Sequence, residues 1–293
     1  IRAVAVGLVG SEMCIRDRGG LMTNHSSRNA VIQTFKAVKK RQQIEKIGYF
    51  IASFVLVLVV WEVGRATHLV NPKLFPSFAA VCKAFVQFLK DGTLIAHMYA
   101  SFVRVLIGFS LGIVAAVILG FLIGWFRVIR LIVDPLVSFF RALPPIALIP
   151  LMIIFFGIGE TSKIIVLTYA SFFPALVVIY QALIGLEPIY GRAAQTLGVN
   201  NWEMFHKIIL PQLYPHIITA CRVSLGVCWA TLVAAELIAA QKGIGAMMVE
   251  AQNFFQMAPL VLGVLLIGAI SLVMDSIVRA IERRATAWQE KRA

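Results

Sequence analysis

Charged residues are scarce in this sequence: they make up 14% of 293 residues, against a hydrophobic share of 60% and a mean hydropathy of +0.87. A soluble domain of ordinary composition carries about 25% charged residues. Several stretches of about 18 or more residues hold almost no charge, and a helix of that length crosses the ~30 Å hydrocarbon core of a bilayer. This scarcity excludes an ordinary soluble domain and predicts an all-α, polytopic integral membrane protein.

Residues that carry enzyme chemistry are also few and scattered. The five histidines cluster nowhere and no H-E-x-x-H motif occurs, which argues against a membrane-embedded enzyme. The phosphate loop G-x-x-x-x-G-K-[ST] is also missing, so we expect the chain not to hydrolyse ATP alone. The four cysteines form no C-x-x-C pair and have no histidine at metal-ligand spacing. We therefore expect no catalytic residue and no metal ligand.

The net charge of +13 gathers near the two ends of the chain. Nine basic residues precede the first apolar run, and five more lie near the end of the chain, from Arg279 onward. If both termini are cytoplasmic, eighteen basic residues fall inside and six outside, as the positive-inside rule predicts. A nucleic-acid interface would need a folded basic surface, which this sequence does not offer.

The opening segment, residues 1–21, differs from the rest of the chain. Its apolar part is too short to span a membrane. The run LVGSEMCIRDR resembles a translated sequencing-adapter segment, so we expect the native chain to begin at Met22. We divide the remainder into a basic cytoplasmic segment (22–46), a transmembrane domain (47–285) and a cytoplasmic tail (286–293).

Apolar periodicity predicts six transmembrane helices. We place them at Ile47–Gly64, Ala100–Trp125, Leu131–Phe156, Lys163–Leu186, Pro215–Ala240 and Pro259–Ile281. An amphipathic run, Phe78–Leu89, lies between the first two. Pro144 and Pro145 interrupt the third span, which is tolerated at membrane depth only where protein or water satisfies the freed carbonyls. The break either lines a pathway or only shapes the packing.

Small residues recur every fourth position along the second span. The stripe consists of Gly108, Gly112, Ala116, Gly120 and Gly124. Because helices in lipid associate through close backbone approach, we expect this stripe to be a packing surface, within one subunit or between two.

Polar residues inside the spans are candidates for a translocation pathway, since an ionisable group in a span is a functional candidate by default. The candidates are Arg141, Ser224, Thr231 and Glu236. Glu236 lies near the outer end of its span and is equally consistent with an interfacial position. Three acids near span ends, Glu62, Asp134 and Asp275, are interpreted as solvated or paired anchors.

A polar loop of 25 residues, Glu187–Pro211, separates the fourth and fifth spans. Proline after Glu187 suits the first turn of a helix, and Gly198 suits the left-handed residue that ends it. Asn200 or Asn201 can cap a second short helix, which Pro211 would close. Both helices carry an apolar side, and an exposed apolar surface needs a partner to cover it.

This loop resembles the EAA signature of permease subunits of binding-protein-dependent ABC importers. The matching residues are Ala193, Ala194, Gly198, Ile208, Leu210 and Pro211. Arg192 stands where the signature has glutamate, so no role of that acid is carried over. The resemblance implies the type I ABC importer permease fold, with the loop docking as a coupling helix on a cytoplasmic ATPase.

The resemblance covers nearly all of residues 47–293. The run RALPPIALIPLMIIFFGIGETSKI is similar to the branch that handles nitrate, sulfonates, taurine and bicarbonate, and TLVAAELIAA with RRATAWQ is most similar to taurine permeases. It implies a bacterial inner-membrane importer of a small anionic or zwitterionic substrate. The importer that the resemblance implies contains two copies of this chain, or one copy with a close relative. It also contains ATP-binding subunits that use ATP and Mg²⁺, and a periplasmic or lipid-anchored binding protein.

A secondary transporter driven by an ion gradient is the alternative from another class. Such proteins show corresponding broken helices in two halves, and no convincing internal repeat is visible in this sequence. Uptake that survives ATP depletion but not loss of the proton gradient would favour it. Within the resembled family, nitrate, bicarbonate or another small organic substrate stays open beside taurine.

Overall fold

The computed structural model describes residues 75–186 and 198–285 continuously, together with 45, 48, 49, 52, 53, 55–65, 189, 191, 192 and 196. The chain forms two units, Ile1–Ala66 and Thr67–Ala293. In the first unit residues 55–65 are helical, and Arg65 pairs with Glu62 at 3.3 Å. The expected first span, Ile47–Gly64, therefore lies partly outside the described residues.

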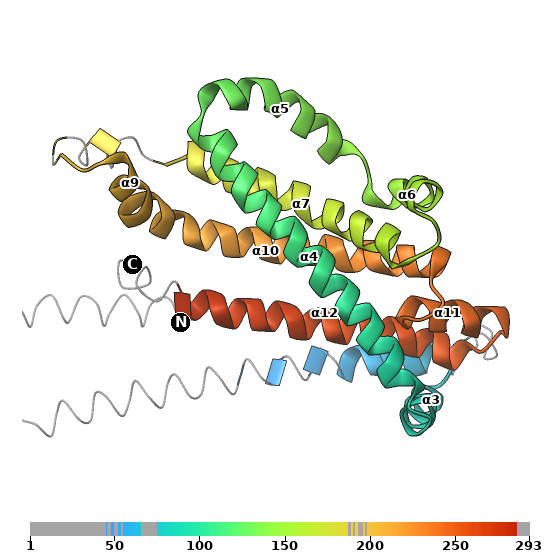
Figure 1. The fold of residues 1–293 in the computed structure, drawn as a ribbon. Helices are drawn as coiled ribbons and strands as arrows, with labels where there is room; N and C mark the ends of the chain where they lie inside the picture. Colours follow the sequence, from blue (N-terminus) through green and yellow to red (C-terminus); the bar gives the residue numbers. More distant parts are fainter. Residues whose placement is uncertain are drawn as a thin grey trace, which may run out of the picture. The chain divides into compact units, whose positions relative to one another are not determined.

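The described part of the second unit consists of helices joined by short turns, and its first helix is α3 (Phe78–Lys90) (Figure 1). Ser77 caps this helix, because its hydroxyl accepts the Ala80 N–H at 3.2 Å. Val81 and Ala84 are buried, while Phe85 on another face is exposed. The helix thus occupies the amphipathic run expected from the sequence.

The centre of this unit is the contact between α4 (Thr93–Trp125) and α7 (Glu160–Ile184). The small-residue stripe of α4 makes this contact possible, because a Cβ built on Gly108 would lie 2.5 Å from that of Leu167. Gly120, Gly124 and Ala116 take part as well: the first two face Ile179 and Leu183, and the third is fully buried. The stripe therefore packs within the chain.

Two further long helices complete the bundle: α10 (Leu210–Ala239) packs along α7, and α12 (Met257–Ala285) contacts α10 and α3 (Figure 1). Between them lies α11 (Ile244–Asn253), which the sequence analysis did not predict. With ten residues it is too short to span a bilayer, and nothing in its composition separates it from a loop next to a span.

The expected third span, Leu131–Phe156, is not one helix. Instead α5 (Arg127–Ala142) is followed by a 3₁₀ turn (Pro145–Leu148) and α6 (Ile149–Phe156), at an angle of 85°. The residue before a proline is disfavoured in helical conformation, and both Leu143 and Pro144 are extended, with ψ of 122° and 126°. Two consecutive prolines therefore turn the chain instead of kinking a continuous helix.

Four helices of the described chain are long and apolar enough to cross a membrane, and a fifth span results if the bent pair is counted once. They cover Thr93–Trp125, Glu160–Ile184, Trp202–Ala239 and Met257–Arg284. Only 28% of the α4 window and 17% of the α12 window are buried inside the chain. Large apolar faces of both helices therefore remain for lipid or for other subunits, as expected of an all-α membrane protein.

A side chain at Gly112 should destabilise the α4–α7 contact. A Cβ there would meet the Ser171 hydroxyl and lie 2.6 Å from the Thr168 carbonyl oxygen. Overpacking of this kind costs about 1–3 kcal/mol. We expect Gly112→Ala to lower the melting midpoint of the detergent-solubilised chain by several degrees in scanning fluorimetry. Gly268→Ala on α12, where a Cβ meets nothing within 4 Å, is the matched control. Equal midpoints for the two variants would contradict the packing role.

Candidate functional site

The features of interest lie at opposite ends of the helix bundle. The loop end is defined by Trp125, Ile184 and Leu210, where α4 and α7 finish and α10 begins. The far end carries Thr93, Glu160 and Ala239. Figure 1 shows α9 (Asn201–Met204) at the loop end and α11 at the far end.

Part of the expected coupling loop is described, and Gly198 is its clearest feature. This glycine has φ of +69°, the left-handed conformation expected for a residue that ends a helix. Ile189 and Arg192, in the preceding helical residues, are exposed. The expected helix start at Glu187 and Pro188 and the signature residues Ala193 and Ala194 lie outside the described residues.

The second short helix of the loop does not end at Pro211, contrary to expectation. Instead α9 continues through a π-helical turn, Phe205–Ile209, into α10, so that Trp202–Ala239 forms one helix of 38 residues. Proline removes one helical hydrogen bond, and its ring crowds the carbonyl four residues earlier. In the wider turn Leu210 donates its N–H to the Phe205 carbonyl, five residues back. The π-helical turn thus accommodates Pro211 within the helix, and the loop continues into the span without an interruption of the helix.

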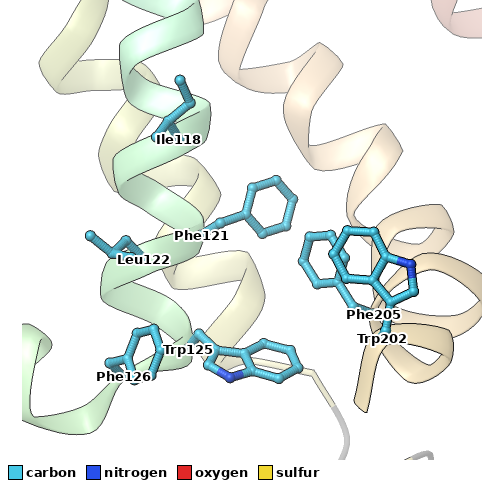
Figure 2. A pocket seen from close by; sticks show the side chains of 7 residues that line it. All are labelled: Ile118, Phe121, Leu122, Trp125, Phe126, Trp202 and Phe205. Carbon is cyan, nitrogen blue, oxygen red and sulfur yellow. The ribbon is translucent and has the colours of Figure 1, made fainter. Parts of the chain in front are cut away.

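Aromatic side chains connect this helix to α4 at the loop end. The Phe205 ring lies edge-on to Phe121 at 5.1 Å and to Trp125 at 5.8 Å between centroids. Figure 2 shows these two α4 side chains pointing toward Phe205 and Trp202. Aromatic pairs in this geometry contribute about 0.5–1.5 kcal/mol each beyond the area they bury.

An apolar groove of about 430 Å³ lies along the same contact (Figure 2). We call the continuous helix Trp202–Ala239 the loop helix. The groove is lined by the last turns of α4, the residue after α4 and the first turns of the loop helix: Ile118, Phe121, Leu122, Trp125, Phe126, Trp202 and Phe205. Phe205 gives the expected apolar side to the helix that follows the loop, but its pairing with α4 was not predicted from the sequence.

The far end holds a buried ion pair between Arg104 of α4 and Glu236 of α10. The two side chains are 5% and 1% exposed, and Arg104 Nη1 donates to Glu236 Oε1 at 2.6 Å. Burial removes both charges from water, so the pair is stable only when its other polar atoms are also satisfied. Each member has further partners.

Arg104 also holds a second carboxylate, that of Glu160 at the start of α7. Its Nε and Nη2 donate to the two Glu160 oxygens at 2.5 and 2.7 Å, a bidentate geometry. Arg104 Nη1 donates a second hydrogen bond, to the Lys242 carbonyl at 2.6 Å, and Lys163 donates to Glu160 at 3.2 Å. Arg104 therefore links three segments of the chain: α7, α10 and the turn before α11.

Glu236 is satisfied by backbone and hydroxyl donors from α4 and α11. Ser101 donates to it at 2.7 Å, and Gly245 donates its N–H at 2.9 Å. Ser101 in turn accepts the Ile244 N–H at 2.9 Å. A Cβ on Gly243 would lie 2.5 Å from the carboxylate, and φ there is +141°, so the close approach requires glycine. The carboxylate thus anchors the amino-terminal end of α11.

The four expected pathway residues are not brought together. Glu236 belongs to the far-end cluster, whereas Arg141 is exposed in the last turn of α5. Ser224 is fully buried and its hydroxyl has no hydrogen-bond partner among the described residues. Thr231 is buried and donates to the Val227 carbonyl at 2.8 Å.

Arg104 was not among the residues predicted from the sequence, although a signal for it was present. A charged residue inside a span needs a partner, and Glu236 was the natural partner to look for. The expected anchors are paired: Asp134 accepts from the Tyr180 hydroxyl at 2.9 Å, and Asp275 pairs with Arg222 at 3.2 Å.

The far-end cluster is suited to holding helices together rather than to chemistry. Two carboxylates, Glu160 and Glu236, face two cations, Arg104 and Lys163, so their formal charges balance. No group of three or more histidine, cysteine or acidic residues that could hold a metal occurs in the described part of the chain. The cluster joins α4, α7, α10 and α11 at one point.

Removal of the Glu236 charge should destabilise the far end. Breaking a buried pair leaves an uncompensated charge and costs about 3–5 kcal/mol. We expect Glu236→Gln to lower the melting midpoint in detergent strongly, with Glu203→Gln, which breaks the exposed pair with Lys207, as a control that leaves it unchanged. A Glu236→Gln midpoint equal to that of the unmodified chain would contradict the anchoring role.

Comparison with known proteins places this arrangement in a family. Residues 93–287 match the family described as "Binding-protein-dependent transport system inner membrane component". An ABC transporter permease protein of Brucella abortus (strain 2308) is 39% identical over 245 residues, which are 84% of this chain and 97% of that protein. The taurine transport system permease protein of Escherichia coli (strain K12) is 34% identical over 81% of this chain and 88% of its own length.

Solved structures support the fold. An amino acid ABC transporter chain has a TM-score of 0.58 at 14% identity and covers 68% of this chain and 97% of its own length. A chain of the MetNI methionine ABC transporter has a TM-score of 0.53 at 20% identity, covering 64% and 96%. The chain belongs to the family of binding-protein-dependent transport system inner membrane components and is a permease subunit of an ABC importer.

Proposed function

We propose that two copies of this chain, or one copy with a close relative, form the translocation pathway of an ATP-driven importer for taurine or a related sulfonate. The taurine permease of Escherichia coli supports this substrate at 34% identity. A bicarbonate transport system permease protein of Synechococcus elongatus is 27% identical and supports a wider class of small anions. The substrate in this proposal is a small anion or zwitterion that an external binding protein delivers.

The loop Glu187–Pro211 acts in this proposal as the coupling segment that docks on a cytoplasmic ATP-binding subunit. The exposed residues Ile189 and Arg192 and the left-handed turn at Gly198 support a protruding surface there. ATP and Mg²⁺ are used by the partner subunit, and this chain contributes no cofactor of its own. Both termini lie on the cytoplasmic side of a bacterial inner membrane, which the excess of basic residues on that side supports.

One observation carries the coupling mechanism: a single helix of 38 residues joins the loop to the far-end cluster. At about 1.5 Å per residue it extends roughly 57 Å. Displacement of the loop by the ATPase therefore moves Glu236 with it. ATP and the loaded binding protein then drive transport because each favours a different conformation.

The far end would face the binding protein. An open groove of about 400 Å³ lies there beside Arg104 and Glu160, with the exposed Tyr99, Gln241 and Lys242 around it. Ser224 and Thr231 lie seven residues apart on α10, hence on one face of the helix. We keep them, with Arg141, as candidates to line the pathway when the subunits separate.

Uptake of labelled taurine tests the proposal. The chain, expressed from Met22, would replace the native permease in a strain that keeps the matching ATPase and binding protein. We expect uptake that requires ATP and that nitrate does not abolish in competition. Gly198→Trp should reduce uptake to background, because a bulky residue in left-handed conformation distorts the loop. Gly198→Asn is the matched control, since asparagine tolerates this conformation and should keep most of the uptake.

Each part of the proposal can fail separately. Normal uptake by Gly198→Trp would show that the loop does not couple the subunits. Uptake of only nitrate or bicarbonate would leave the permease assignment intact and refute taurine. Uptake that survives ATP depletion and stops on loss of the proton gradient would refute the ATP-driven mechanism.

A further inference from the structure

The apolar groove at the loop end is continuous with the exposed face of α4. Ile118 and Leu122, which line it, are 62% and 41% exposed, and Val114 one turn earlier is 58% exposed. On the other side Trp202 is 68% exposed. A contiguous apolar surface of this kind indicates a contact with lipid or with another protein.

Cationic residues follow the groove-lining residues along the chain. Arg127 and Arg130 begin α5 directly after the lining residue Phe126, and Arg127 is exposed. On the loop helix Lys207 is 71% exposed and bonds Glu203 at 2.8 Å, while His206 stacks on Trp202. The basic residues outnumber this acid, so the rim of the groove favours a negatively charged group.

The aromatic residues indicate how deep the groove lies. Trp125 and Trp202 contribute to its lining. Tryptophan is enriched at the level of the lipid headgroups, where its ring is apolar and its N–H remains hydrated. Guanidinium groups at the same level bind phosphate in a forked geometry, and basic pockets between spans on the cytoplasmic side bind anionic headgroups. The apolar part of the groove then extends from this level into the leaflet.

We propose that this groove binds one anionic phospholipid from the leaflet on the loop's side. An acyl chain lies between α4 and the loop helix, beside Phe121 and Phe205, and the phosphate is held by Arg127 and Arg130. In the proposed orientation this is the cytoplasmic leaflet, but the site does not depend on which substrate is imported. The lipid bridges α4 and the coupling loop, and its binding stabilises their contact.

Native mass spectrometry of the full chain in mild detergent tests this site with phosphatidylglycerol and phosphatidylcholine of identical acyl chains. We expect one phosphatidylglycerol to bind more tightly than phosphatidylcholine. Ile118→Trp should fill the groove and abolish that preference. Val114→Trp, on the same exposed face of α4 but outside the groove lining, is the matched control and should keep it.

A second pair of variants addresses the headgroup. Each of Arg127→Gln and Arg130→Gln should weaken phosphatidylglycerol binding about fivefold, since one basic residue near the membrane surface contributes about that much. Binding of phosphatidylcholine should not change. This pattern would separate a phosphate contact from general loss of folding, which would lower the binding of both lipids.

Several results would overturn the proposal. Equal binding of the two lipids by the unmodified chain would show that no anionic site exists. Loss of the preference in both tryptophan variants would indicate a general lipid shell. If Ile118→Trp alters the oligomeric mass and leaves lipid binding unchanged, a second copy of the chain occupies the groove.

Discussion

The buried ion pair between Arg104 and Glu236 is the interaction on which the far end of this permease depends. Two charges that are 5% and 1% exposed remain stable there because Ser101, the Gly245 N–H, the Lys242 carbonyl and Glu160 satisfy their other polar atoms. The ends of four helices therefore meet at one point.

At the loop end, α4 also contacts the helical segment that continues into α10. There the contact is aromatic, between Trp125 and the Phe205 ring that precedes α10 in the continuous helix. Two contacts therefore hold α4 against the loop helix: the ion pair at the far end and the aromatic side chains at the loop end. The ion pair is sensitive to geometry, whereas the aromatic contact tolerates sliding.

Features that depend on local sequence were predicted well, and features that depend on distant residues were not. The run from Phe78 is a helix because an apolar stripe follows a serine cap. Arg104 and Glu236 are 132 residues apart, so no periodicity connects them. Pro211 was wrongly predicted to end a helix, because the neighbouring residues do not indicate a π-helical turn. The stripe at Gly108 predicted a packing surface, but its partner α7 became visible only in the structure.

The central claim is that the loop before the 38-residue helix contacts a cytoplasmic ATPase. Photo-crosslinking in cells that express the whole transporter tests it most directly, with a photoreactive residue at the exposed Ile189 and, for comparison, at Lys242 of the far end. Our account predicts an adduct with the ATP-binding subunit from position 189 and none from position 242. An ATPase adduct from position 242, or none from position 189 in an active transporter, would contradict it.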